Sequence, residues 1–303
     1  MQEITLNFSP QSLTLLNVVL GVVMFGIAID LRVADFKRVL QLPRAVFAGL
    51  CAQFLALPAA TFVLIQILRP APEFALGMLL VSSCPGGNIS NFVTHISRGN
   101  SALSVTMTAV SSLAAIVMTP LNFAFWGQLD SHLAPLLQSV SLQFSDMLVM
   151  VCIMLGAPLA LGMWLAARYP GFSAYLRTPL RWFSFAAFFG FVLAAAANNL
   201  DAFRQYLSLV LGLVVLHNLI AFGCGYLLAR LVRLPDADTR AVTVEVGIQN
   251  SGLGLILIFN FFNFFGGLGG MALIAACWGI WHIIAGSVLA SFWSRRPLHG
   301  THT

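Results

Sequence analysis

Residues 242–257 read VTVEVGIQNSGLGLIL, an apolar run that contains a single acidic side chain, Glu245. Insertion scales put the cost of a carboxylate at the centre of a bilayer at roughly 2.5–3.5 kcal/mol. Such a group persists where a cation, a proton or a water-lined cavity offsets its charge. The polar and glycine residues of 249–252 follow closely and supply both oxygen ligands and a weak point in a helix. This stretch predicts an ion site within an interrupted membrane helix.

The composition is typical of a polytopic membrane protein. Charged residues make up 8% of the 303 residues and hydrophobic ones 59%, whereas a soluble domain carries about 25% charged residues. The net charge of +5 does not indicate nucleic-acid binding, because the arginines are separated by apolar runs. The five cysteines lie far apart in apolar stretches, which predicts buried free thiols and no zinc site.

Nine apolar stretches are long enough to cross a bilayer, which takes about 20 residues. The longest linker between them, about 126–146, leaves room for a short interfacial segment. The predicted spans cover about 11–30, 45–68, 74–95, 101–125, 147–167, 181–198, 205–229, 241–262 and 268–292.

The basic residues predict the orientation of these spans, since Lys and Arg accumulate on the cytoplasmic side. With nine spans and the N-terminus outside, every basic residue except Arg69 and Arg204 falls in a cytoplasmic segment. If one span had been missed or added, basic residues would fall on both sides of the membrane in similar numbers. We therefore predict that the C-terminus is cytoplasmic, with 293–303 as a tail.

Two of the nine stretches contain helix-breaking residues. In the third, residues 82–91 read SSCPGGNISN, where Pro85 removes a backbone donor and two glycines weaken the helix. The eighth contains GIQNSGLG at 247–254. Irregular backbone at membrane depth is tolerated inside protein or beside water, but not against lipid.

The spacing of the two breaks predicts an inverted repeat. They lie five spans apart, so their spans cross the membrane in opposite directions. Paired discontinuous helices of this kind form a binding site near the midplane, where they cross. The two repeats would cover about 11–125 and about 147–292 of one transporter domain, the first without its opening span.

Oxygen-bearing side chains accompany both breaks, and oxygen is the ligand that a hard cation such as sodium prefers. Ser104 and Thr108 are four residues apart and share a helix face, as do Glu245 and Gln249. The remaining candidates are Ser90 and Asn91, which follow the first break, and Gln53 in the second stretch.

Each of these candidates also has an ordinary structural explanation. Ser and Thr in membrane helices commonly bond to their own backbone, Gln53 could join two helices, and Pro85 could form a kink without a ligand. His217 and His282 lie within apolar stretches, where interhelical hydrogen bonding explains them. Glu245 differs, because an intramembrane carboxylate is functional by default.

Three segments in this order resemble the bile acid:sodium symporter family: Cys84–Asn91, Gly99–Thr108 and Glu245–Gly252. The resemblance implies a nine-span, bacterial-type member with a core and a panel domain, two sodium ions and alternating access. It places the chain in the plasma membrane, the inner membrane of a bacterium. Further family-like positions are Met24–Gly26, Gln53, Trp281 and His282.

The resemblance also implies roles for individual residues. One sodium site would use Ser90, Asn91, Ser104, Thr108 and Glu245. The other would use Gln53, Glu245, Gln249 and the backbone carbonyls of Val246 and Ile248. The substrate would bind where the broken helices cross, near Asn88, Asn250 and His282.

The chain departs from the family pattern after His282. Bacterial relatives often have asparagine at the next position, whereas this chain has Ile283. The change removes a polar group near the implied substrate region. The resemblance therefore does not imply a bile acid as substrate, since many members of the family move smaller organic acids such as pantoate or pyruvate.

The leading hypothesis is a sodium-coupled symporter that imports an organic anion, surrounded by membrane lipid and with no nucleic-acid or protein partner implied. The alternatives are a proton-coupled organic-acid carrier that uses Glu245, and a receptor or sensor with the same cavity. An enzyme is disfavoured, because Glu245 has no acidic partner in the apolar stretches and the sequence contains no Gly-x-Ser-x-Gly segment.

Overall fold

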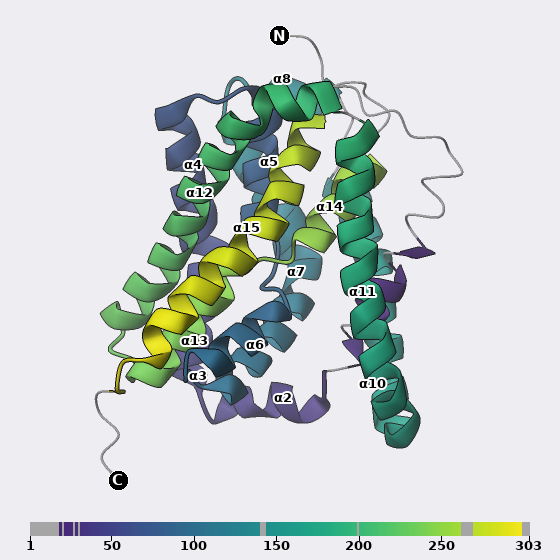
Figure 1. Ribbon diagram of the computed structural model, residues 1–303, viewed down its shortest axis with the longest axis vertical. Coiled ribbons are helices and arrows are strands. Elements are labelled where there is room, and N and C mark those ends of the chain that lie inside the picture. Colours follow the sequence, from purple (N-terminus) through teal and green to yellow (C-terminus); the bar gives the residue numbers. More distant parts are fainter. Residues whose placement is uncertain are drawn as a thin grey trace.

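The chain folds into a bundle of helices (Figure 1). The computed structural model describes residues 18–298 apart from 20, 27, 30, 140–143, 199 and 262–268. The helices are α2 (Val33–Lys37), α3 (Pro43–Cys51), α4 (Leu57–Leu68), α5 (Pro72–Ser83), α6 (Ile89–Ile96), α7 (Ser101–Leu129), α8 (Ala134–Ser139), α9 (Phe144–Val151), α10 (Ala157–Arg168), α11 (Pro170–Asn198), α12 (Leu200–Leu231), α13 (Asp236–Gly247), α14 (Ser251–Phe261) and α15 (Gly269–Ser294). Shorter turns are the 3-10 turn η1 (Arg38–Leu40) and the π-helical turns η2 (Ala52–Ala56) and η3 (Cys152–Gly156).

Four helices of the described chain are long and apolar enough to cross a membrane. They are Pro43–Leu68, in which η2 joins α3 to α4, together with α7, the Arg204–Leu231 part of α12, and α15. Helices of this length and composition are typical of an integral membrane protein, since a span takes about 20 apolar residues. The count of nine spans stays a prediction, because half of the stretch 11–30 lies outside the described residues. The sixth predicted stretch, 181–198, belongs to a longer helix, because α11 already begins at Pro170, a residue suited to the first turn of a helix.

One face of α7 is apolar and exposed. Leu113, Val117, Leu121 and Phe125 recur every four residues and are each about half exposed. The opposite face carries buried polar side chains such as Thr108. A contiguous exposed apolar stripe marks a contact surface, and on a membrane-capable helix that surface is suited to lipid.

Both predicted interruptions are present in the structure. Helix α5 ends at Ser83 and α6 begins at Ile89, while α13 ends at Gly247 and α14 begins at Ser251. Pro85 lies in the first gap, where it cannot donate the backbone hydrogen bond that would continue α5. The local sequence therefore explains where the first helix stops.

The two breaks cross as an isolated antiparallel bridge between Gly86 and Gln249. The backbone hydrogen bonds of this bridge satisfy N–H and C=O groups that the ends of the broken helices leave free. The bridge also brings together the carboxyl ends of α5 and α13 and the amino ends of α6 and α14. Two hydrogen bonds of 2.8 Å close the bridge, from the Gly87 N–H to the Ile248 carbonyl and from the Asn250 N–H to the Pro85 carbonyl.

Both glycines of the first break are required by close approach. A Cβ atom at Gly86 would overlap the carboxylate of Glu245. A Cβ atom at Gly87 would lie 2.9 Å from the carbonyl oxygen of Gln249, which is too close for carbon and oxygen that are not bonded. The pair Gly86-Gly87 therefore permits the crossing, in addition to weakening the helix.

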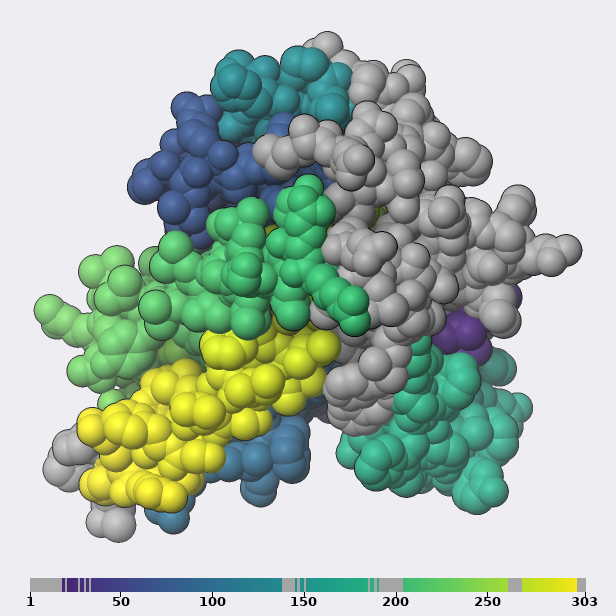
Figure 2. Space-filling model, turned by 45° about the horizontal axis from the view of Figure 1, so that its top comes forward, coloured from purple at the N-terminus to yellow at the C-terminus, as the bar shows by residue number. Residues whose placement is uncertain are grey.

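Helices α10 and α11 lie along one side of the bundle, and α4 and the lower ends of α12 and α15 lie on the other (Figure 1). In Figure 2 the green α12 and the yellow α15 lie side by side, and the teal α10 occupies another part of the visible face. Helix α12 also packs closely on α13 at Gly225, where a Cβ atom would lie 2.8 Å from the Cα atom of Thr243. The second broken helix is thus backed by a long continuous one.

Candidate functional site

The Glu245 carboxylate lies near the carboxyl end of α13 and is fully buried. The Thr108 hydroxyl donates to its two oxygens, at 2.8 Å to Oε1 and 3.0 Å to Oε2. The Ser90 hydroxyl donates to Oε2 at 2.5 Å, and the Ser104 hydroxyl donates to the same oxygen at 3.4 Å. Helices α6, α7 and α13 thus converge on one carboxylate through hydroxyl groups.

This cluster contains more oxygen atoms than protons. The Thr108 hydroxyl also lies 3.0 Å from the Ser104 carbonyl oxygen and 3.4 Å from Asn91 Oδ1, and its oxygen lies 3.5 Å from the Ser90 hydroxyl. One hydroxyl carries one proton, so it cannot satisfy all of these acceptors together. Several lone pairs therefore face one another around a negative charge, which is the donor set of a hard cation.

The structure brings together all five residues of the first predicted sodium site. The spacing of Ser104 and Thr108 predicted that they share a face, and both lie against Glu245. Ser90 and Asn91 reach the same point because α6 begins directly after the crossing. Their role as ligands remains a prediction, which the function proposed below develops.

The second predicted set surrounds the crossing itself. Gln53 Nε2 donates to the Cys84 carbonyl at 2.7 Å and to Gln249 Oε1 at 2.8 Å. Gln249 Nε2 in turn donates to the Val246 carbonyl at 2.6 Å. These amides connect η2, the end of α5 and the end of α13 in one buried chain of hydrogen bonds.

Two oxygens of this second set stand out. Gln53 is 1% exposed, and its Oε1 has no hydrogen-bond partner among the described residues. The Ile248 carbonyl accepts from the Gly87 N–H. Glu245 is connected to the set through the backbone of α13, without a side-chain hydrogen bond to Gln53 or Gln249 among the described contacts.

The three predicted substrate residues are not joined by hydrogen bonds among the described contacts. Asn250 is 8% exposed, and its Oδ1 accepts from the Leu253 N–H at 3.1 Å, which caps α14. Asn88 lies at the start of α6 and is half-buried. His282 is buried in α15, and its Nδ1 has no partner in the described part of the chain.

Asn218 is a polar residue beside the crossing that the sequence analysis did not single out. It is fully buried in α12, and its Nδ2 donates to the Gly247 carbonyl at 2.8 Å. A carboxamide inside an apolar stretch is the same signal that selected Gln53, so the sequence did offer a cue. His217, its neighbour, contacts the Thr61 hydroxyl at 2.7 Å and packs edge-on against Trp278.

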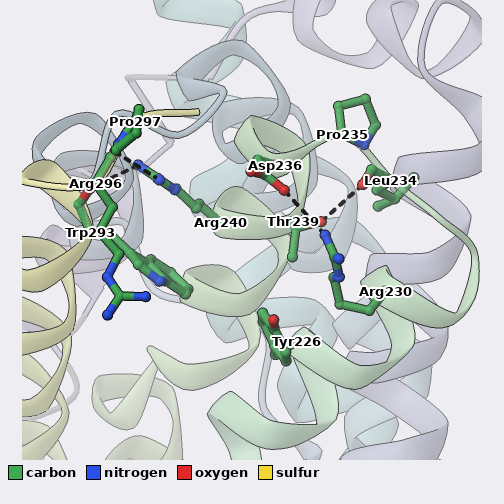
Figure 3. A pocket seen from close by; sticks show the side chains of 10 residues that line it. All are labelled: Tyr226, Arg230, Leu234, Pro235, Asp236, Thr239, Arg240, Trp293, Arg296 and Pro297. Carbon is green, nitrogen blue, oxygen red and sulfur yellow. Dashed lines mark hydrogen bonds and ion pairs between the residues drawn. The ribbon is translucent and has the colours of Figure 1, made fainter. Parts of the chain in front are cut away.

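A cavity of about 660 Å³ lies at the start of α13 (Figure 3). Arg240 is 5% exposed there, and its guanidinium donates to the carbonyls of Ser97, Trp293 and Arg296 at 2.7, 3.0 and 3.2 Å. Arg230 is paired with Asp236 at 3.1 Å. Both arginines thus bond to groups of the protein. Arg240, on α13, holds the carboxyl ends of α6 and α15 through their carbonyls.

Comparisons with known proteins identify the family of the chain. The family model described as the Sodium Bile acid symporter family matches residues 17–206. The uncharacterized sodium-dependent transporter YocS of Bacillus subtilis (strain 168) is 32% identical over 281 residues, which are 93% of this chain and 83% of the relative. The probable sodium/metabolite cotransporter BASS1, chloroplastic, of Arabidopsis thaliana is 32% identical over 298 residues, which are 97% of this chain and 70% of the relative.

A more distant match is the P3 protein of Homo sapiens, 31% identical over 237 residues, which are 77% of this chain and 48% of the relative. The matches to YocS and BASS1 cover nearly the whole chain, including both breaks. They indicate a transporter and not an enzyme. The chain therefore belongs to the sodium bile acid symporter family, a family of sodium-dependent transporters.

Proposed function

We propose that the protein is a symporter that uses two sodium ions to import a small organic anion. The observation that carries the proposal is the buried Glu245 carboxylate, surrounded by hydroxyl and amide oxygens from α6 and α7. Oxygens crowded around a negative charge are stabilised by a cation that replaces the missing protons. The names of the relatives, a sodium-dependent transporter and a sodium/metabolite cotransporter, support sodium as that cation.

The first sodium ion would bind between α6, α7 and α13. It would take the Glu245 carboxylate and the oxygens of Ser90, Asn91, Ser104 and Thr108 as ligands. An ion here would fix α6 against α13, since each contributes a ligand from beside the crossing. Sodium would thereby order the region where the substrate is proposed to bind.

The second sodium ion would bind on the other side of the crossing. Its ligands would be Gln53 Oε1, Gln249 Oε1, the Glu245 carboxylate and the carbonyls of Val246 and Ile248. Gln53 Oε1 is already a buried oxygen without a hydrogen-bond partner in the described chain. The Gln249 amide would have to release the Val246 carbonyl, to which it now donates. Both ions would share Glu245, so binding of one would influence the other.

The proposed substrate lies where the amino ends of α6 and α14 meet, near Asn88, Asn250 and His282. Helix amino ends have free N–H groups and partial positive charge, so they favour an anion. The residue after His282 is the apolar Ile283, and a site with few polar side chains suits a small carboxylate better than a polyhydroxylated molecule. We therefore propose an organic acid of modest size as the cargo.

Transport would proceed by alternating access in an inner membrane, with the N-terminus outside and the C-terminus in the cytoplasm. The antiparallel bridge at Gly86 and Gln249 supports two inverted repeats, about 11–125 and about 147–292. The core would hold the broken helices, and α10 and α11, on the other side of the bundle, would belong to the panel. Sodium and substrate must raise each other's affinity by the same factor.

The test is substrate-dependent and sodium-dependent stabilisation, followed by uptake into proteoliposomes. A thermal-shift screen of organic acids, each with sodium or with potassium, identifies the cargo. Glu245→Ala is expected to abolish the sodium response while the protein still elutes as a folded species. Glu73→Gln is the control, since the Glu73 carboxylate accepts the Gly270 N–H outside the cluster.

An undiminished sodium response in Glu245→Ala would refute the assignment. Uptake driven by a pH gradient in sodium-free buffer would instead favour proton coupling through the same carboxylate. Counterflow of labelled substrate distinguishes a carrier from a receptor, because a receptor does not exchange substrate across the bilayer.

A further inference from the structure

Two buried carboxamides hold the carboxyl ends of the two broken helices. Gln53 Nε2 donates to the carbonyl of Cys84, the residue at which α5 has ended. Asn218 Nδ2 donates to the carbonyl of Gly247, the last residue of α13. In each case the donor comes from a continuous apolar helical segment that passes behind the break.

The two contacts occupy equivalent places in the crossing. Gln249 pairs with Gly86 in the bridge. Gly247 lies two residues before Gln249, and Cys84 lies two residues before Gly86. The match extends to the remaining amide oxygens. Gln53 Oε1 and Asn218 Oδ1 are both buried and without a hydrogen-bond partner among the described residues. Asn218 is thus the counterpart of Gln53 in the other half of the chain.

The three carbonyls at the carboxyl end of α13, those of Val246, Gly247 and Ile248, each accept a hydrogen bond. The Val246 carbonyl accepts from Gln249 Nε2, and the Ile248 carbonyl accepts from the Gly87 N–H. The Gly247 carbonyl lies between these two proposed sodium ligands, and Asn218 supplies its hydrogen bond. A buried carbonyl left without a donor costs about 1–3 kcal/mol. Without Asn218 the backbone at Gly247 would therefore rotate toward another donor, and the neighbouring carbonyls would turn with it.

The position of Asn218 is itself set by close packing. A Cβ atom at Gly247 would overlap the ring of Phe222, and one at Gly225 would lie 2.8 Å from the Thr243 Cα atom. Asn218, Phe222 and Gly225 recur at intervals of four and three residues, so they form one face of α12. That face contacts α13 along its length and aims the amide at the broken end.

We infer that Asn218 is a positioning residue for the second sodium site: it holds the Gly247 carbonyl, and so orients the Val246 and Ile248 carbonyls and the Gln249 side chain toward the ion. This role rests on the proposed sodium-coupled function. Asn218 itself is not a ligand in this account. Its effect is transmitted through one backbone turn.

The experiment compares the sodium dependence of thermal stability in detergent-solubilised, purified full-length protein. Sodium chloride is titrated against potassium chloride at constant ionic strength, without substrate. Asn218→Ala is expected to raise the sodium concentration for half-maximal stabilisation about three- to tenfold, the factor that one hydrogen bond corresponds to. Asn218→Gln keeps a carboxamide donor and is expected to lie between Asn218→Ala and the wild type.

Thr61→Val is the matched control for the loss of a buried hydrogen bond. The Thr61 hydroxyl is fully buried and bonds to the Leu57 carbonyl and to His217 on α12, and the described contacts include no hydrogen bond from it to the broken helices. This variant is expected to melt at a lower temperature in both salts with an unchanged half-saturation. A purely structural role for Asn218 would give the same pattern.

An Asn218→Ala curve that coincides with Thr61→Val in half-saturation would overturn the inference. If Asn218→Ala yields no folded protein, Asn218→Gln and Asn218→Thr decide the same question. A sodium concentration for half-maximal stabilisation that equals the wild-type value in both variants would overturn the inference. A wild-type protein that sodium fails to stabilise would be a different result, since it would remove the proposed function itself.

Discussion

Gly86 faces the carboxylate of Glu245 so closely that no side chain fits between them. The bridge between Gly86 and Gln249 produces this contact, because Gln249 follows Glu245 by one helical turn on the same segment. The crossing of the two breaks and the buried charge are therefore one structural unit. A substitution that displaces the backbone at the crossing is therefore expected to change sodium binding.

Gly86→Ala is expected to eliminate sodium-dependent stabilisation, because the added methyl group overlaps the Glu245 carboxylate. The measurement is the thermal shift on adding sodium. Gly254→Ala is the control, since its Cβ atom would lie an ordinary 3.8 Å from Cys84 Sγ close to the same crossing. A normal sodium response in Gly86→Ala would show that the carboxylate is not held where the structure places it.

Thr108→Val is expected to raise the sodium concentration for half-maximal stabilisation by about ten- to a hundredfold, as hydrogen bonds to a charged group are worth about 1.5–3 kcal/mol. The change keeps the size of the side chain and removes one oxygen. Thr106→Val serves as the comparison, because the Thr106 hydroxyl is equally buried on α7 but bonds to the Ala102 carbonyl of its own helix. Equal sodium curves for the two variants would contradict the assignment of Thr108 as a ligand.

Gln53→Leu is expected to reduce the steepness of the sodium dependence of uptake, from a Hill coefficient of about two toward about one. The reason is that two ions binding together give a coefficient up to the number of sites, and this change removes a ligand from the second site alone. Gln66→Leu is the control on the same continuous helix, where Gln66 bonds to Asp130 away from the crossing. A Gln53→Leu protein with unchanged steepness would argue against a second ion at this position.

Arg240→Met is expected to lower the melting temperature by a similar amount in sodium and in potassium. Arg240 donates to three carbonyls at the ends of α6 and α15, and its loss leaves them without these donors. Arg230→Met should have a much smaller effect, since an exposed ion pair is worth about 0–1 kcal/mol. A selective loss of the sodium response in Arg240→Met, with stability in potassium unchanged, would assign this arginine to the ion site instead.

The amino-acid sequence was sufficient to predict the class of protein and the places where two helices break. Pro85 and the glycines act on their own backbone, so their effect can be predicted without a neighbour. The same holds for the shared face of Ser104 and Thr108, which follows from helical periodicity. Glu245 was identifiable because burying a charge in an apolar stretch is costly wherever the stretch packs.

The partners of these residues depended on the packing of helices distant in sequence. Thr106 and Thr108 are alike in sequence context, and both hydroxyls lie near a carbonyl of their own helix, yet among the described contacts only Thr108 also bonds to Glu245, because the two residues face different neighbours. The hydrogen bond from Asn218 to Gly247 likewise exists only because α12 packs on α13 through Gly225. Local patterns specify conformation along the chain, whereas a ligand set requires distances between segments, and those are set by how the helices pack.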